Sequence, residues 1–143
     1  MAPTELRHAD SEADLRACFD VMRQLRPRLQ SADHMLAALA PQRAQGYRLL
    51  ACWQGSRPLA LAGYRKLDNL IHGSFLYVDD LVTDSGERGR RYGEQLLAAL
   101  REIGKALGCG QLVLDTALSN EDAQRFYRRV GMEACALHFR QTM

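Results

Sequence analysis

Hydrophobic positions in the N-terminal part of the chain recur with the period of a helix. Over residues 12–25 they return every three or four positions, which predicts an amphipathic helix that ends before Pro27. A second helix is predicted over 31–44, where Pro41 either lies inside the helix or starts a new one. A short strand over 4–8 is expected to precede both helices.

The middle of the chain has the pattern of strands. Residues 47–54 and 58–66 predict two strands that are joined by a tight turn at Gly55. After a second turn rich in Asp, Asn and Gly, residues 74–83 predict a third long strand. We expect these three strands to pair as antiparallel neighbours.

Helical and extended patterns then alternate to the end of the chain. A helix is predicted over 89–107, a strand over 111–116, a helix over 121–130 and a closing strand over 134–142. The strand–helix–strand step from 74 to 116 should be a right-handed parallel crossover. The order therefore predicts an α/β architecture, a mixed sheet with helices on its faces.

Length, charge and cysteine content narrow the class of protein. The 143 residues predict a single domain over 1–143, and the 47% hydrophobic and 25% charged content is ordinary for a soluble globular protein. A formal net charge of +2 is too small to indicate general nucleic-acid binding. No apolar run approaches the ~20 residues of a membrane span, and the N-terminus lacks the apolar core of a signal peptide. The four cysteines are widely spaced, so we expect reduced thiols in a cytoplasmic protein without a metal site.

The stretch 76–100 carries the clearest chemical signal. An apolar strand ends in a loop that contains Arg88, Gly89, Arg90 and Arg91, and an amphipathic helix follows at once. Amides in such a loop and in the first turn of the helix lack intrahelical acceptors, so they form a site for an anionic phosphate. Arginines are unfavourable at the positive end of the helix dipole, and a bound anion would offset that effect. Solvated loop charges and a nucleic-acid patch are the alternatives.

This order of elements and two spacings resemble the GNAT superfamily of N-acetyltransferases, most strongly over residues 76–131. The family signature is Arg or Gln, two residues, Gly, one residue, then Gly or Ala, and the chain matches it at Arg88 and Gly93. Arg91 stands where the family usually has glycine. Asn120 and Tyr127 lie seven residues apart on one helix, as in family members that use Asn and Tyr beside the cofactor.

The resemblance implies a mostly antiparallel central sheet with a splayed pair of parallel strands, 76–83 and 111–116, and helices on both faces. Acetyl-CoA would lie in the gap between those two strands as a cosubstrate. Backbone groups at the end of the first strand would pair with the pantetheine amides, and the amides of 89–94 would hold the pyrophosphate. The residues so implied in cofactor binding are Leu81, Val82, Thr83, Arg88, Gly89, Arg90, Arg91, Tyr92, Gly93, Glu94 and Asn120.

Acetyl transfer to an amine needs a neutral amine and a stabilised leaving thiolate. We expect Asp115, or else Asp79, to deprotonate the amine through water. Asp79 and Asp80 should point to opposite faces of their strand, and the sequence does not say which one faces the substrate. Tyr127 is expected to donate a proton or hydrogen bond to the CoA thiolate.

The leading functional hypothesis is therefore an enzyme that moves acetyl from acetyl-CoA to a primary amine of a small molecule, peptide or protein. A non-catalytic CoA-binding or regulatory module is the alternative. The modest net charge argues against nucleic acid as a partner, and no membrane partner is expected. By family analogy, the acceptor site would be lined by helices 12–25 and 31–44 and by the hairpin 66–74. A homodimer is common among family members, and no feature of the sequence decides this point.

Overall fold

The computed structural model describes residues 2–143, which divide into two compact units. The larger unit ends at Val113, and the other unit is Leu114–Met143. The single domain expected over 1–143 stays a prediction.

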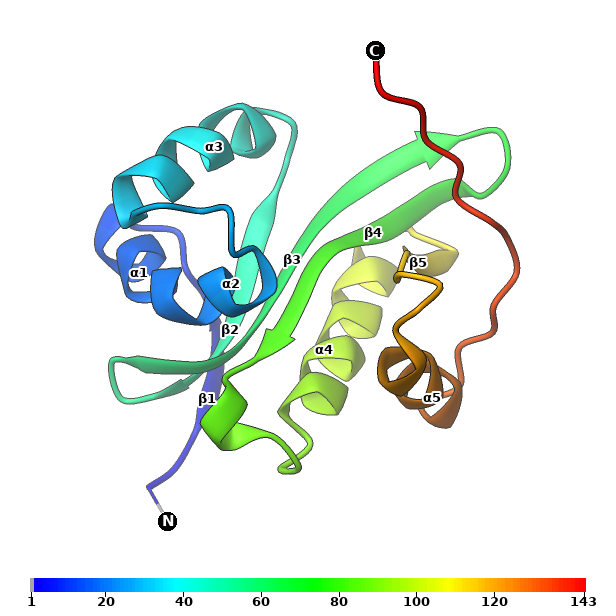
Figure 1. The fold of residues 1–143 in the computed structure, drawn as a ribbon. Helices are drawn as coiled ribbons and strands as arrows, with labels where there is room; N and C mark the ends of the chain where they lie inside the picture. The colour runs from blue at the N-terminus through cyan, green and yellow to red at the C-terminus, as the bar shows by residue number, and fades with distance from the viewer. Residues whose placement is uncertain (1) are drawn as a thin grey trace. The chain divides into compact units, whose positions relative to one another are not determined.

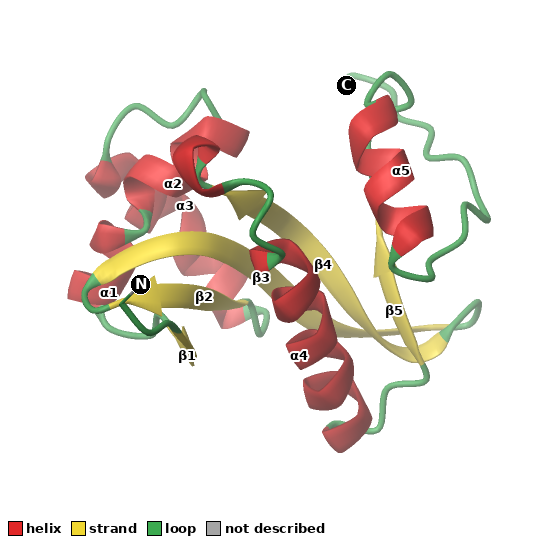
Figure 2. Ribbon diagram, turned by 90° about the horizontal axis from the view of Figure 1, so that it is seen from below, coloured by secondary structure: helices red, strands yellow, loops and turns green. Residues whose placement is uncertain are grey.

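The strands form one mixed sheet. Their bounds are Glu5–His8 (β1), Arg48–Gln54 (β2), Arg57–Asn69 (β3), Gly73–Thr83 (β4) and Gln111–Leu114 (β5), and their order in the sheet is β1-β2-β3-β4-β5. The first four strands pair as antiparallel neighbours, and β5 is parallel to β4 (Figure 2). The predicted mixed α/β fold is confirmed.

Helices cover both faces of this sheet in the larger unit. They are Glu12–Ala17 (α1), Phe19–Leu25 (α2), Ala32–Ala44 (α3) and Tyr92–Ala106 (α4). Figure 1 shows α1, α2 and α3 on one side of β3 and β4, and α4 on the other. Leu49, Ala51 and Trp53 of β2 belong to the buried core beneath α1–α3. The alternate residues of β2 therefore face the side of α4, where Leu96 and Leu100 are fully buried.

Local contacts explain how the two predicted N-terminal helices compare with the observed ones. The predicted helix 12–25 divides into α1 and α2 at Cys18, whose amide donates to both Asp14 O and Leu15 O in a tightened turn. The predicted helix 31–44 continues through Pro41, which lies inside α3. Among the described residues, no helix combines the length and the apolar character that a membrane span requires.

The helix predicted over 89–107 begins three residues late, at Tyr92. Residues Ser85–Glu87 form a short 3-10 turn (η1), and the loop that follows contains Gly89 at φ 81° and Arg91 at φ 64°. Both values lie in the left-handed region, which an α-helix cannot include.

The closing strand predicted over 134–142 is wrong. In the unit Leu114–Met143 the only regular element after β5 is the helix Glu121–Arg129 (α5), and residues 132–143 are described without helix or strand. The alternating Leu137 and Phe139, which suggested a strand, are 65% and 86% exposed. Alternation alone does not make a strand when no neighbouring strand pairs with it.

Candidate active site

The start of α4 offers backbone donors. The first helical hydrogen bond runs from the Gln95 amide to Arg91 O at 3.0 Å, so the amides of Tyr92, Gly93 and Glu94 have no acceptor within the helix. The side chains of Arg88 and Arg91 are exposed beside this turn. Free amides at the positive end of a 15-residue helix form a suitable site for a phosphate group.

Arg91 adopts a conformation that favours glycine. It is the N-cap of α4, at φ 64° and ψ 22°, and its side chain makes no capping hydrogen bond. For a residue with a Cβ atom, this left-handed conformation costs about 1 kcal/mol. Arg91 thus has a backbone conformation that glycine adopts more readily, at the position where the family resemblance implies glycine.

We expect Arg91→Gly to raise the free energy of unfolding by up to about 1 kcal/mol, because glycine removes the left-handed strain. The matched control is Arg88→Gly, since Arg88 is extended at φ −68° and gains nothing from glycine. Urea denaturation of both variants measures the difference. If Arg91→Gly loses as much stability as Arg88→Gly, the arginine side chain stabilises the turn and the argument from strain fails.

The loop before α4 is held to the sheet and to α2. Arg57 on β3 contacts the carboxylates of Asp84 and Glu87, each at 3.1 Å. Gln24 of α2 donates to Asp84 Oδ1 at 3.0 Å and accepts from the Ser85 amide at 2.9 Å. The Gln24 hydrogen bond is the main cause that lowers the pKa of Asp84 below its ordinary value. These contacts fix the direction from which the loop enters α4.

The carboxyl end of β4 has one edge that β5 does not cover. Leu81, Val82 and Thr83 pair with β3 on one side. On the other side, β5 starts beside Ser74, where the Gly110 amide donates to Ser74 O at 2.9 Å, and it is only four residues long. Because parallel strands advance at equal rates, β5 ends short of Leu81.

A β-bulge interrupts β4 at the two neighbouring aspartates. The register passes from Gly63↔Asp80 to Tyr64↔Val78, so Asp79 is the extra residue. The predicted alternation of Asp79 and Asp80 is therefore wrong at this point. Asp79 accepts two hydrogen bonds from Arg65, at 3.0 and 2.7 Å, so both of its carboxylate oxygens are occupied.

Asp80 is held on the side of the sheet that α2 and α3 cover. Its Oδ2 accepts from the hydroxyl of Tyr47 at 2.8 Å, and its Oδ1 accepts from Arg26 Nε at 2.9 Å. Burial, and then the charge of Asp80, raise the pKa of Tyr47 far above its ordinary value, so this phenol is a permanent donor. A Cβ atom on Gly63 would lie 1.9 Å from the Tyr47 hydroxyl oxygen, so only glycine leaves room for this ring.

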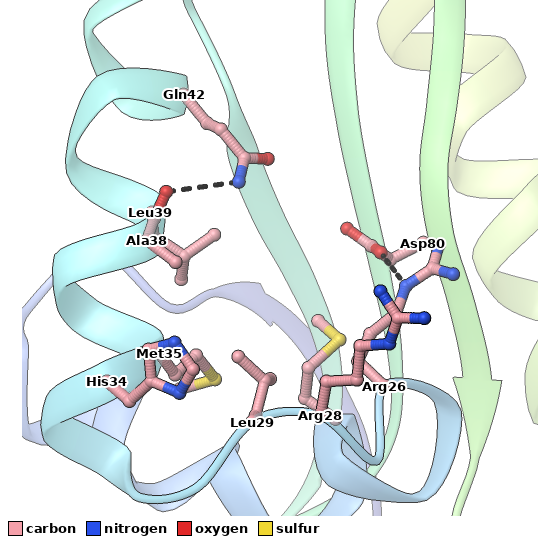
Figure 3. A pocket seen from close by; sticks show the side chains of 10 residues that line it. Arg26, Arg28, Leu29, His34, Met35, Ala38, Leu39, Gln42 and Asp80 are labelled. Atoms are coloured by element: carbon pink, nitrogen blue, oxygen red, sulfur yellow. Dashed lines mark hydrogen bonds and ion pairs between the residues drawn. The ribbon is translucent and has the colours of Figure 1, made fainter. Parts of the chain in front are cut away.

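Asp80 lines a pocket of about 290 Å³ between α2, α3 and β4 (Figure 3). The apolar lining residues include Met22, Leu29, Met35 and Leu39, and the polar ones include Arg26, Arg28, His34 and Asp80. Nothing in the sequence groups these residues, because they come from elements far apart in the chain. One signal was present: a glycine at position 63 in a strand pattern indicates a bulge or a close approach.

The remaining candidate residues lie in the unit Leu114–Met143. Asn120 accepts from the Ala123 amide at 3.1 Å and caps the start of α5. Tyr127 is half-buried on α5, and burial raises the pKa of its phenol. Asp115 follows β5, and its Oδ2 lies 3.3 Å from Nδ1 of His138. Asp79 and the cofactor-binding candidates 81–83 and 88–94 lie in the larger unit.

Comparisons with known proteins agree on one family. The profile of the Acetyltransferase (GNAT) family matches residues 12–132. An uncharacterized N-acetyltransferase of Bacillus subtilis, YhdJ, is 26% identical over 122 residues, which are 85% of this chain and 86% of that protein.

Solved structures share the fold. A Trypanosoma brucei acetyltransferase has a TM-score of 0.82 at 23% identity, with 99% of this chain and 100% of that one covered. The aminoglycoside N-acetyltransferase AAC(6')-Iy, solved in complex with CoA, has a TM-score of 0.81 at 16% identity, with 100% and 97% covered.

Proposed function

The chain belongs to the acetyltransferase (GNAT) family and is an acyltransferase, and we propose that it moves acetyl from acetyl-CoA to a primary amine. The amine attacks the thioester directly, and CoA leaves as a thiol after proton transfer. The relative solved with CoA supports this choice of cosubstrate.

The proposal rests on one observation: at two places in the larger unit, backbone groups are available to hydrogen-bond with CoA. The amides of Tyr92, Gly93 and Glu94 have no acceptor in α4 and would bind the diphosphate. The edge of residues 81–83 extends past the end of β5 and would pair with the pantetheine amides. Arg88, Gly89, Arg90 and Arg91 are proposed to complete the diphosphate site, and Asn120 to contact the cofactor arm.

We place the acceptor amine in the pocket beside Asp80. An alkylamine of pKa ~10.4 costs about 4–5 kcal/mol to hold neutral at pH 7. Positioning of the two reactants contributes up to ~7–11 kcal/mol, so it is the larger effect. Asp80 is the carboxylate that lines the pocket, and we add it to Asp79 and Asp115 as a proposed proton acceptor.

Tyr127 is proposed to protonate, or to donate a hydrogen bond to, the leaving thiolate, because a phenol is protonated at neutral pH and is of roughly the same basicity as a thiolate. Tyr127→Phe should lower kcat about 10²-fold at saturating acetyl-CoA. Tyr64→Phe is the control, since it removes a phenol hydroxyl from a buried tyrosine that bonds to His8. Steady-state kinetics test this role: a kcat for Tyr127→Phe within about twofold of wild type would show that Tyr127 is structural.

Release of CoA thiol from acetyl-CoA tests the proposed function. With a panel of amines, we expect thiol release that depends on the amine and an acetylated product detected by mass spectrometry. Calorimetry with CoA separates the alternatives. Tight binding of CoA without turnover of any amine would favour a non-catalytic CoA-binding module, and absence of CoA binding to folded protein would refute both functions.

A further inference from the structure

The charges of the pocket beside Asp80 do not balance. Arg26 and Arg28 are cations that line it, and Asp80 is the single carboxylate among its lining residues. Asp80 is already paired with Arg26 at 2.9 Å. Arg28 has no acidic partner in the part of the chain that the structure describes. The exposed side chain of Arg28 therefore brings to the rim of the pocket one positive charge that no acidic side chain pairs.

Of its remaining polar lining residues, Arg28 and His34 present donors, whereas Gln42, whose Nε2 donates to Ala38 O at 3.1 Å, keeps an acceptor oxygen. His34 Nδ1 accepts from the Gln30 amide at 3.0 Å, so the ring proton lies on Nε2 and that nitrogen is a donor. Arg28 contributes the N–H groups of its guanidinium and no acceptor. Figure 3 shows Arg28 extending on the same side as Arg26 and Asp80, with His34 on the opposite wall. A ligand that satisfies Arg28 and His34 must supply acceptors.

The walls between these polar groups are apolar. Met22, Leu29, Met35 and Leu39 line the pocket, and a carbon skeleton would bury apolar surface against them. The volume of about 290 Å³ lies at the lower end of the range for small-molecule sites. The pocket thus suits a compact ligand that is apolar in the middle and anionic at the group that meets Arg28.

We infer that the acceptor is a small amine that also carries an anionic group, a carboxylate or a phosphate, and that Arg28 binds this group. The inference rests on the proposed function, because it assigns this pocket to the acceptor. The amine would lie near Asp80 and the apolar skeleton would pack on Met35 and Leu39. Polyamines would be poor acceptors, since their charge repels that of Arg28.

Matched pairs of amines test the inference by turnover. The pairs are 6-aminohexanoate with hexylamine, and 3-aminopropyl phosphate with 3-amino-1-propanol; spermidine is the polycationic probe. We expect kcat/KM for the anionic member to exceed that of its neutral partner about 10-fold or more, the effect of one charge-assisted hydrogen bond. Comparison of the two anionic amines distinguishes carboxylate from phosphate.

Variants of Arg28 assign the preference to one residue. Arg28→Gln should reduce the anionic-to-neutral ratio of kcat/KM to about one, and Arg28→Lys should restore part of the ratio. Arg23→Gln is the control, because it removes an exposed arginine of α2 that does not line the pocket. An unchanged ratio in Arg28→Gln, or a preference for neutral amines or spermidine, overturns the inference.

Binding without chemistry keeps this test separate from that of the proposed function. If CoA binds and no amine reacts, the methyl resonances of Met22 and Met35 still report occupancy of the pocket by each member of a pair. Shifts at lower concentration for the anionic member, lost in Arg28→Gln, support the inference about the pocket even though the enzymatic proposal has failed. Equal binding of both members, or no binding of either at millimolar concentration, overturns it.

Discussion

Replacing Gly63 by alanine is expected to lower the free energy of unfolding by about 2–3 kcal/mol and to reduce acetyl transfer. The added Cβ atom would lie 1.9 Å from the hydroxyl oxygen of Tyr47 and 2.4 Å from its ring carbon Cζ. Tyr47 is 3% exposed, so its ring cannot swing into solvent without leaving the core. Any shift of the ring also breaks the 2.8 Å hydrogen bond to Asp80. Chemical denaturation of the variant, together with its rate of thiol release, measures both effects.

Gly104→Ala is the matched control for this variant. Gly104 is also buried, but the nearest atom to its added Cβ, in Cys109, is 3.6 Å away, an ordinary contact. Because Gly104 lies inside α4, alanine there should raise stability by about 0.5–1 kcal/mol. Equal stability changes in the two variants would show that the Tyr47 ring moves freely, and the proposed role of Gly63 would be wrong.

Asp80→Asn is expected to lower kcat/KM about 10²-fold, with little change in the fold. Asparagine has nearly the same shape and can still accept from Tyr47, but it loses the negative charge beside Arg26 and cannot accept the proton of the amine. The pH dependence of kcat/KM should lose its acidic limb if Asp80 is the proton acceptor. Rates with the best amine of the panel, measured across pH, provide this result.

The same measurement on three further variants identifies the proton acceptor. Asp79→Asn removes the ion pair with Arg65 but leaves the pocket lining unchanged. Asp115→Asn tests the candidate in the second unit, and Asp33→Asn is a control on the exposed face of α3. If the acidic limb disappears in Asp115→Asn or Asp79→Asn while Asp80→Asn keeps it, the assignment to Asp80 is refuted.

Local rules were sufficient where neighbours in the sequence decide the structure. Ser11, Ser31 and Asn120 each precede a predicted helix and accept a backbone hydrogen bond from the third residue after them. The strands and their antiparallel order followed from alternation and from turn residues. The loop before α4 was recognised from a strand, glycines and arginines that lie close together in the chain.

Local rules failed where contacts between distant elements or a change of backbone region decide the structure. The start of α4 was predicted three residues early, because the left-handed turn at Arg91 carries no glycine to signal it. The closing strand was inferred from alternation, which cannot show whether a pairing partner exists. The alternation of Asp79 and Asp80 was broken by a bulge that depends on pairing between β3 and β4.

The order of amino acids alone determined the α/β class, the family resemblance and the place of the loop proposed to bind phosphate, since each depends on periodicity or on residues within one short stretch. Only the tertiary structure selected Asp80 over its neighbour as the carboxylate that lines the pocket, and brought Arg26, Arg28 and His34 beside it. The physical reason is that a bulge and the packing of α2 and α3 on the sheet set the direction of these side chains. Such contacts join residues more than 30 positions apart, where sequence spacing carries no geometric information.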